Sequence, residues 1–299
     1  MIEIVSGSKR FADITALDKV SLSVPDGSIF GLAGTNGSGK STLLRAMAGV
    51  YRLDNGEVTV DGEPVYENPN AKRKVFLLSD DYYFFNGAGI KENAEFLASV
   101  YPNFDMESCL SLTESLKLSE KRNVNTFSKG MKKQAALILA LSAKTEYLLC
   151  DETFDGLDTV MRQTAKKLFA ASVAEGKLTP VIASHNLREI EDICDKICIL
   201  HSGNVIFTSD LDELKTETHK IQCAFENEPD GATLAALGVV RYEKRGKVYE
   251  LIAKGDKEAL LERLSSAEVK FCEILPLTLD EIFTCSMEER GYDFSKIIQ

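Results

Sequence analysis

The chain has 299 residues, of which 44% are hydrophobic and 27% are charged. These fractions are ordinary for a globular protein, and the length predicts about two domains at roughly 150 residues each. The 46 acidic and 35 basic residues give a net charge of −11, so we expect no nucleic-acid partner, because binding phosphates needs a basic surface.

The first 65 residues alternate in polarity and contain frequent turns. Strands are expected over residues 2–5, 20–24, 29–33 and 58–60, with turns at Asp26-Gly27 and Asp61-Gly62. The strand at 29–33 leads into a glycine-rich loop, and a helix over residues 40–49 follows with its apolar residues on one face. A strand, a loop and a helix therefore follow one another directly.

Buried strands and helices alternate through the middle of the chain. Apolar runs at residues 75–78, 147–150, 181–183 and 197–200 read as strands, and residues 90–143 are mostly helical in pattern. This alternation is typical of an α/β fold whose parallel sheet is covered on both faces. The pattern changes near residue 210.

Residues 218–299 are expected to form a small α+β unit. Strands are predicted over 220–225, 239–243 and 248–253, and a helix over 257–264. A second helix is expected to begin near Thr278, because Thr278 and Glu281 have the spacing of a capping box.

Neither a secretory signal nor a membrane span is expected. The longest uncharged apolar-rich stretch, residues 134–143, is shorter than the ~20 residues that span a bilayer. Seven cysteines without a C-x-x-C pair indicate free thiols in a reducing, cytoplasmic environment. Any work at a membrane would need another chain to do the spanning.

Residues 34–41 fit the pattern G-x-x-x-x-G-K-[ST], which binds nucleotide phosphates. Backbone amides wrap the phosphates, and the N-terminus of the following helix attracts their negative charge. The lysine is expected to reach the β- and γ-phosphates, the serine to ligate Mg²⁺, and the next threonine to approach the α-phosphate. The predicted nucleotide-binding residues are Gly34, Asn36, Gly37, Ser38, Gly39, Lys40, Ser41 and Thr42.

The strand at 147–150 ends in two carboxylates, Asp151 and Glu152. Ligands bind at the carboxyl edge of a parallel sheet, where these side chains are expected. Asp151 is predicted to hold Mg²⁺ through its waters, and Glu152 to polarise the water that attacks the γ-phosphate.

The motifs together resemble the ATP-binding subunit of an ABC transporter. Residues 127–134 are similar to the ABC signature in the S-K-G-M-K form known from exporters, and residues 153–158 resemble the D-loop. His185 follows a strand as the family's switch histidine does, and Phe11 stands where the family places a ring against adenine. The order of these motifs and the intervals between them match the family pattern throughout residues 1–210.

This resemblance implies a P-loop cassette over residues 1–210. Its fold would have a mixed sheet with a RecA-like core, an antiparallel β subdomain and a helical subdomain at about 85–145, with residues 218–299 as an extension. Two cassettes, identical or different, would enclose two ATP molecules. Ser128 and Gly130 would bind the partner's γ-phosphate, Asp158 would couple the two sites, and His185 would hold the catalytic geometry.

The resemblance also implies a partner and a place in the cell. The cassette would power a permease on a separate chain, for export, from the inner face of the cell membrane. A soluble ABC ATPase outside transport and a regulatory ATP-sensing cassette are the alternatives. If the chain were a small-molecule kinase, the signature and His185 would have no role.

Three features leave the family pattern or allow two interpretations. Asp80 stands where the family usually has a glutamine, and its carboxylate could approach Mg²⁺ or its water. Lys129, Lys132 and Lys133 are expected to form a solvated basic helix face rather than catalytic contacts. The four aromatic residues 82–85 could either line a groove for a permease helix or pack beneath the helical subdomain.

Overall fold

The computed structural model describes residues 1–289 except 177 and 268. The chain divides into two compact units, Met1–Thr208 and Ser209–Gln299, and each is described by itself. Within the described residues, no helix combines the length and the apolar character needed to cross a membrane.

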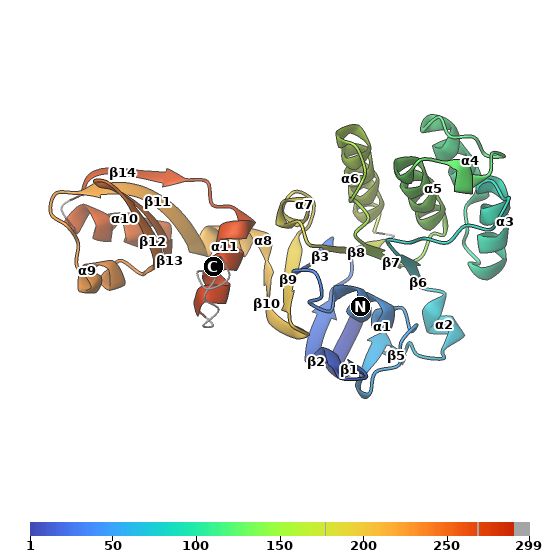
Figure 1. The fold of residues 1–299 in the computed structure, drawn as a ribbon, viewed down its shortest axis with the longest axis horizontal. Helices are drawn as coiled ribbons and strands as arrows, with labels where there is room; N and C mark the ends of the chain where they lie inside the picture. Colours follow the sequence, from blue (N-terminus) through green and yellow to red (C-terminus); the bar gives the residue numbers. More distant parts are fainter. Residues whose placement is uncertain (177, 268, 290–299) are drawn as a thin grey trace. The chain divides into compact units, whose positions relative to one another are not determined.

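An antiparallel sheet forms the N-terminal part of the first unit. It contains β1 (Ile2–Phe11), β2 (Ile14–Val24), β4 (Asn55–Val60) and β5 (Glu63–Pro64) in the order β2-β1-β4-β5. The predicted strands here are correct in place but too short. Backbone pairing with β2 continues to the end of β1, through Lys9, Arg10 and Phe11, where the side chains no longer alternate between buried and exposed. Figure 1 shows β1 and β2 in blue beside α1.

The central sheet has the order β10-β9-β3-β8-β7-β6. Its strands are β3 (Phe30–Ala33), β6 (Val75–Leu78), β7 (Tyr147–Asp151), β8 (Thr179–Ser184), β9 (Lys196–His201) and β10 (Asn204–Asp210). The strand β3 pairs in parallel with β8 and β9, and β7 pairs in parallel with β6 and β8. Every residue of β3, β7 and β8 is buried, which explains their uninterrupted apolar runs. The expected α/β fold with a parallel sheet is confirmed.

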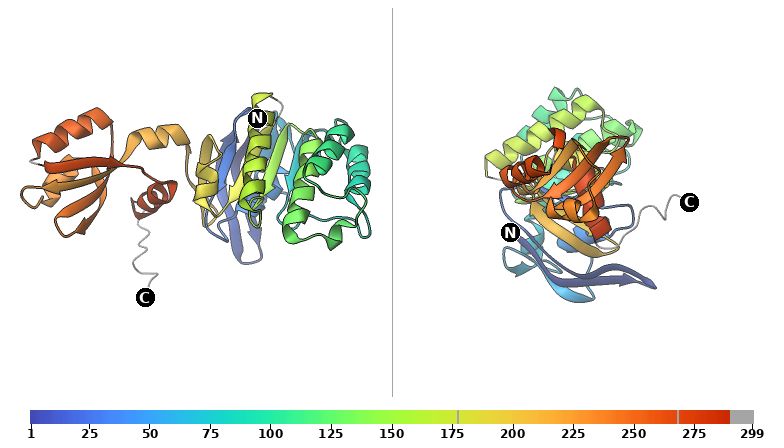
Figure 2. Two further views of the ribbon diagram at one scale, coloured as in Figure 1. Left: turned by 90° about the horizontal axis from the view of Figure 1, so that it is seen from above. Right: turned by 90° about the vertical axis from the view of Figure 1, so that its left-hand side faces the viewer.

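Helices flank this sheet (Figure 1 and Figure 2). The helices α3, α4 and α5 gather beside β6 at one end of the sheet, within the region predicted to be helical. The helices of the first unit are α1 (Lys40–Met47), α2 (Pro69–Lys72), α3 (Ile90–Val100), α4 (Met106–Ser115), η1 (Val124–Thr126, a 3-10 turn), α5 (Lys129–Ser142), α6 (Thr159–Ala174) and α7 (Leu187–Glu191).

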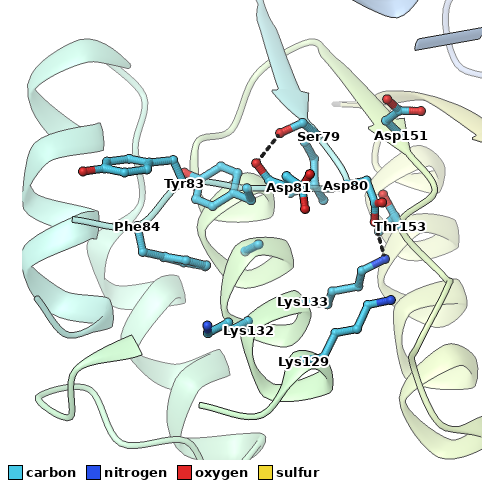
Figure 3. A pocket seen from close by; sticks show the side chains of 13 residues that line it. Ser79, Asp80, Asp81, Tyr83, Phe84, Lys129, Lys132, Lys133, Asp151 and Thr153 are labelled. Atoms are coloured by element: carbon cyan, nitrogen blue, oxygen red, sulfur yellow. Dashed lines mark hydrogen bonds and ion pairs between the residues drawn. The ribbon is translucent and has the colours of Figure 1, made fainter. Parts of the chain in front are cut away.

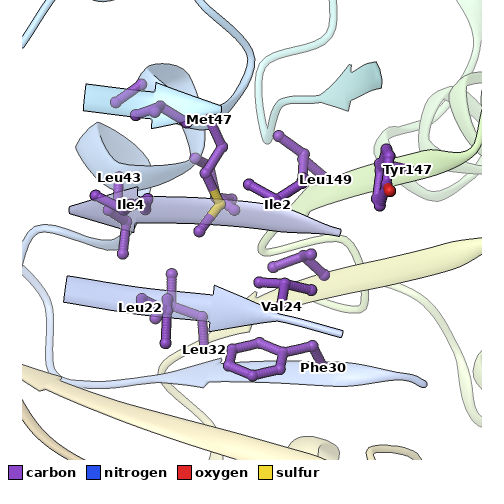
Figure 4. Packing of buried hydrophobic residues seen from close by; sticks show 14 of the residues in the cluster. Ile2, Ile4, Leu22, Val24, Phe30, Leu32, Leu43, Met47, Tyr147 and Leu149 are labelled. Carbon is purple, nitrogen blue, oxygen red and sulfur yellow. The ribbon is translucent and has the colours of Figure 1, made fainter. Parts of the chain in front are cut away.

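A hydrophobic core joins the two sheets of the first unit through α1 (Figure 4). Ile2 and Val24 from the antiparallel sheet, Phe30 from β3 and Met47 from α1 are all completely buried in it. This packing holds β3 and α1 on either side of the glycine-rich loop, and therefore fixes both ends of that loop.

The second unit is a four-stranded antiparallel sheet with helices. Its strands are β11 (Thr218–Phe225), β12 (Val239–Arg245), β13 (Val248–Lys254) and β14 (Val269–Leu275), in the order β12-β13-β11-β14. Its helices are α8 (Leu211–Glu217), α9 (Gly231–Ala236), α10 (Lys257–Ser266) and α11 (Leu279–Glu289). A separate core includes Ile221, Leu251, Leu260 and Leu264.

The predicted capping box at the start of α11 is present. The Thr278 amide donates to Glu281 Oε2 at 3.0 Å, and the Glu281 amide donates to Thr278 Oγ1 at 3.4 Å. The strand β14 was not predicted, because as an edge strand it buries few side chains and lacks a clear apolar pattern.

Candidate functional site

The glycine-rich loop connects the end of β3 to the start of α1, as the sequence predicts. A Cβ on Gly34 would lie 2.2 Å from the Leu200 carbonyl oxygen, so only glycine fits against β9 at this position. Gly39 precedes α1 with φ +108°, and within the described structure no side chain caps the first amides of the helix. These amides are free to bind an anion at the helix N-terminus.

Lys40 lies beneath the loop with its side chain only 6% exposed. Its ammonium donates to the carbonyls of Gly34 at 2.7 Å and Thr35 at 3.2 Å, and it lies 3.7 Å from Glu152 Oε1. Burial lowers the pKa of Lys40, while the carboxylates of Glu152 and Asp151 partly oppose that change. The lysine therefore links the loop to the acidic end of β7.

Ser41 and Asp151 face each other across the same space. The Ser41 hydroxyl donates to Asp151 Oδ1 at 3.0 Å. Burial raises the pKa of Asp151, and the hydrogen bond from Ser41 partly counteracts that rise. A hydroxyl and a carboxylate are hard oxygen donors of the kind that Mg²⁺ takes together with substrate phosphates and water, so this pair fits the ion.

Glu152 and His185 come together because β7 and β8 are neighbours, with Asp151 opposite Ala183. His185 Nδ1 lies 2.9 Å from Glu152 Oε2. Glu152 has φ +48°, an unfavourable backbone conformation for a residue with a side chain. Such strain persists only where surrounding bonds fix the backbone, and it is commonly found at functional sites.

The remaining predicted residues occupy other parts of the first unit. Phe11 is 39% exposed and its ring meets that of Tyr51 edge-on at 5.3 Å. Ser128 caps α5 by accepting from the Met131 amide at 3.2 Å, and Asp158 caps α6 by accepting from the Met161 amide at 2.9 Å. Their helix-capping roles are therefore present whatever else they bind.

Other loop residues differ in exposure. Asn36 and Gly37 are exposed at the tip of the loop, Thr42 is half-buried in α1, and Ser38 is buried. Gly130, which was predicted to contact the partner's phosphate, lies near the turn after Glu152, and a Cβ there would be 3.5 Å from the Gly156 oxygen.

Asp80 makes a contact that the sequence did not indicate. Lys133 Nζ lies 2.8 Å from Asp80 Oδ1 (Figure 3). The same ammonium donates to the Glu152 carbonyl oxygen at 2.8 Å. Asp80 and Asp151 line the same cavity, of about 420 Å³, but the carboxylate of Asp80 is paired with the lysine. The part that Asp80 would play at a metal ion stays a prediction.

The expectation of a solvated basic face on α5 is wrong for Lys133. Its side chain is only 10% exposed, because it reaches between the ends of β6 and β7. Lys129, one turn earlier, is well exposed but pairs with Asp155 at 3.1 Å. The only signal in the sequence that Lys129 and Lys133 reach the same region is their spacing of four residues, which places them on one helix face.

The residues of the aromatic segment alternate between packed and exposed, and the groove for a permease helix stays a prediction. Phe84 is buried and Tyr82 stacks on Phe76 with ring centroids 6.2 Å apart. Tyr83 is 70% exposed, and Phe85, also exposed, lies 4.8 Å from the ring of Phe96. One side of the segment therefore packs inward, and the other presents aromatic rings to solvent.

Comparisons with known proteins show the family of the chain. The family model described as ABC transporter matches residues 17–155. The ABC transporter ATP-binding protein YtrB of Bacillus subtilis is 32% identical over 283 residues, which are 95% of this chain and 97% of YtrB. The sulfate/thiosulfate import ATP-binding protein CysA of Mycobacterium tuberculosis is 32% identical over 209 residues, which are 68% of this chain and 60% of CysA.

Solved structures show the same fold. A dimeric bacterial ABC transporter cassette has a TM-score of 0.65 and 22% identity, and the match covers 71% of this chain and 99% of that chain. A post-hydrolysis dimer bound to ADP and Pi has a TM-score of 0.64 and 21% identity, with coverage of 71% and 99%. The chain belongs to the ABC transporter ATP-binding family, and it is an ATPase.

Proposed function

We propose that this chain binds MgATP at its phosphate loop and hydrolyses it to power a separate membrane permease. The observation that carries the proposal is the convergence of Lys40, Ser41, Asp151, Glu152 and His185 at the carboxyl ends of β3, β7 and β8. Fixed charges and dipoles aimed at a transferring phosphoryl group are the main source of catalysis in such sites.

Each of these residues has a proposed role. The loop amides and Lys40 bind the phosphates, and Glu152 orients and deprotonates the attacking water. His185, 2.9 Å from the Glu152 carboxylate, holds that side chain and contacts the γ-phosphate. Ser41 and Asp151 would hold Mg²⁺, which would neutralise charge on the phosphates, with Asp80 as a further candidate.

A complete site is proposed to need a second cassette. Phe11 would stack on adenine, since its ring is partly exposed. Ser128 and Gly130, at the N-terminus of α5, would bind the γ-phosphate held by the other cassette. Asp158 would connect the two sites. A dimeric cassette among the similar structures supports this proposal.

We further propose that residues 1–210 are the cassette, with its helical subdomain at about 85–145, and that residues 218–299 are a C-terminal extension. The division of the chain near residue 208 supports this assignment. The match to YtrB spans 95% of the chain, whereas that to CysA spans 68%.

The permease is proposed to dock beside α5, at the inner face of the membrane. The exposed rings of Tyr83 and Phe85 provide an apolar surface for a helix. The S-K-G-M-K signature favours export, whereas the similarity to the importer CysA favours import. A transport assay with the reconstituted permease would decide the direction.

Nucleotide-dependent dimerisation tests the proposal. In sedimentation velocity, Glu152→Gln should dimerise with ATP and stay monomeric with ADP, because the site closes on an unhydrolysed γ-phosphate. Lys40→Ala, the control, should remain monomeric with either nucleotide. ATP-independent behaviour of Glu152→Gln would contradict the proposed shared site, and co-purification with an integral membrane protein would separate a transport subunit from a soluble or regulatory cassette.

A further inference from the structure

We propose that Lys133 is a positioning residue of the ATPase site, which fixes the backbone of Glu152 from the signature helix with Asp80 as its charge partner. The inference rests on the proposed function, since it assigns Lys133 a role through the catalytic carboxylate. This role requires no contact between Lys133 and the nucleotide. Its ammonium occupies the space between the ends of two neighbouring parallel strands, β6 and β7.

The first step of the argument is the strain at Glu152. With φ +48°, this backbone is less stable than an ordinary conformation of an L-residue, so other bonds must hold it. The Glu152 amide donates to the Ala183 carbonyl at 3.0 Å, and its carbonyl accepts from the Asp155 amide at 3.2 Å. Lys133 adds a charged hydrogen bond to that same carbonyl at 2.8 Å, which is stronger than a neutral one.

The second step concerns Asp80. The strand β6 ends at Leu78, which pairs with Cys150 of β7, so Asp80 and Glu152 follow neighbouring strand ends. Asp80 Oδ1 lies 2.8 Å from the Lys133 ammonium, whose side chain is 10% exposed. A lysine so far removed from water needs a nearby negative charge, and Asp80 supplies it. The carboxylate at this position is therefore explained by the lysine that it faces.

The third step is the connection to the signature helix. Lys129 and Lys133 lie one turn apart on α5, and both reach the turn that follows β7, through Asp155 and through the Glu152 carbonyl. Ser128 caps the same helix and is proposed to bind the partner cassette's nucleotide. Contacts from α5 therefore connect the residue that is proposed to bind the partner's nucleotide with the backbone of Glu152.

The test compares Lys133→Met, Lys133→Gln and Lys133→Arg in the full chain, with Lys166→Met as the matched control. Lys166 is also a shielded lysine, 13% exposed and 2.7 Å from Asp192, but it lies on α6 away from the strand ends. Two variants that lose the charge guard against one of them failing to fold, and the arginine keeps it.

Hydrogen–deuterium exchange of the nucleotide-free chain measures positioning without turnover. Peptides covering residues 150–157 should exchange at least about threefold faster in the Met and Gln variants, and at the native rate in Lys133→Arg and Lys166→Met. The kcat for ATP should fall about 10- to 100-fold in the Met and Gln variants while KM stays within about threefold, because a displaced base slows chemistry and not binding. Arginine should recover most of the lost rate.

A double-mutant cycle tests the pairing with Asp80. Asp80→Ala should also lower kcat, and Asp80→Ala combined with Lys133→Met should be within about twofold of the slower single variant, because the two side chains act as a unit. If the double variant instead lowered kcat by the product of the two single losses, Asp80 would not be the partner of Lys133.

Native exchange and native turnover in both charge-removing variants would overturn the proposal, and so would an arginine variant as impaired as Lys133→Met. Glu152→Gln separates this proposal from the one on which it rests. Full turnover in Glu152→Gln would contradict the catalytic role of Glu152, whereas an inactive Glu152→Gln beside a fully active Lys133→Met would contradict only the role of Lys133.

Discussion

Replacing Gly39 by alanine should damage both the stability and the nucleotide affinity of the cassette. Gly39 has φ +108°, and an added Cβ would lie 2.5 Å from the backbone oxygen of Ala16. The positive φ costs about 1–2 kcal/mol for an L-residue. The contact with a backbone atom cannot be relieved by rotating a side chain, and it adds about 1–3 kcal/mol.

Gly27→Ala is the matched control, because Gly27 has φ +70° and an added Cβ would meet nothing within 4 Å. Gly27→Ala should lower the free energy of unfolding by about 1–2 kcal/mol, because of the positive φ alone, and leave nucleotide affinity unchanged. Gly39→Ala should cost about 2–5 kcal/mol in total. Because Gly39 precedes the first amides of α1, its displacement should weaken ATP binding at least about tenfold, or 1.4 kcal/mol.

Urea unfolding followed by circular dichroism measures the stability of both variants, and titration with a fluorescent ATP analogue measures their affinity. Equal stability losses in Gly39→Ala and Gly27→Ala, with native affinity in both, would refute the argument that the loop geometry depends on a glycine at the start of α1.

Three further predictions concern the cassette. Lys40→Ala should lower ATP affinity at least about tenfold in the same titration, since it removes a buried cation beside the loop, and retained affinity would contradict the phosphate-binding assignment. Phe30→Ala should cost about 3–5 kcal/mol in urea unfolding, because the ring is completely buried in the core that holds the loop; a loss below about 1 kcal/mol would contradict that packing. Burial raises the pKa of Asp61, but hydrogen bonds from Lys74, the amino terminus and Tyr147 outweigh it and hold that pKa well below its ordinary value. Asp61→Asn should therefore lower the free energy of unfolding by about 1–2 kcal/mol at pH 7, and this loss should shrink as the pH falls below about 4. A loss that does not change with pH would argue against the ion pair.

The fold was predictable where burial is continuous. The strand predicted at residues 75–78 has the same bounds in the structure, as β6, and the capping box at Thr278 is present. The strands β1 and β2 run further than predicted, because backbone pairing continues through stretches where most side chains are exposed or half-buried and form no clear apolar pattern. The edge strand β14 was missed for the same reason.

The candidate site was predictable where one short motif carries the chemistry. The phosphate loop and the pair Asp151-Glu152 stand in contiguous segments, and the structure brings them together. The role of Lys133 could not be predicted, because its contacts depend on the parallel pairing of β6 with β7 and on the position of α5. Charge and helical spacing alone favoured a solvated lysine.

ATPase activity measured against protein concentration, in the presence of Mg²⁺, tests the central claim most directly. Hydrolysis in sites shared by two cassettes predicts a rate that rises more than linearly with concentration in the wild type and is absent in Glu152→Gln. A rate strictly proportional to concentration would contradict the shared site, and equal activity in Glu152→Gln would contradict the assignment of Glu152 as the base.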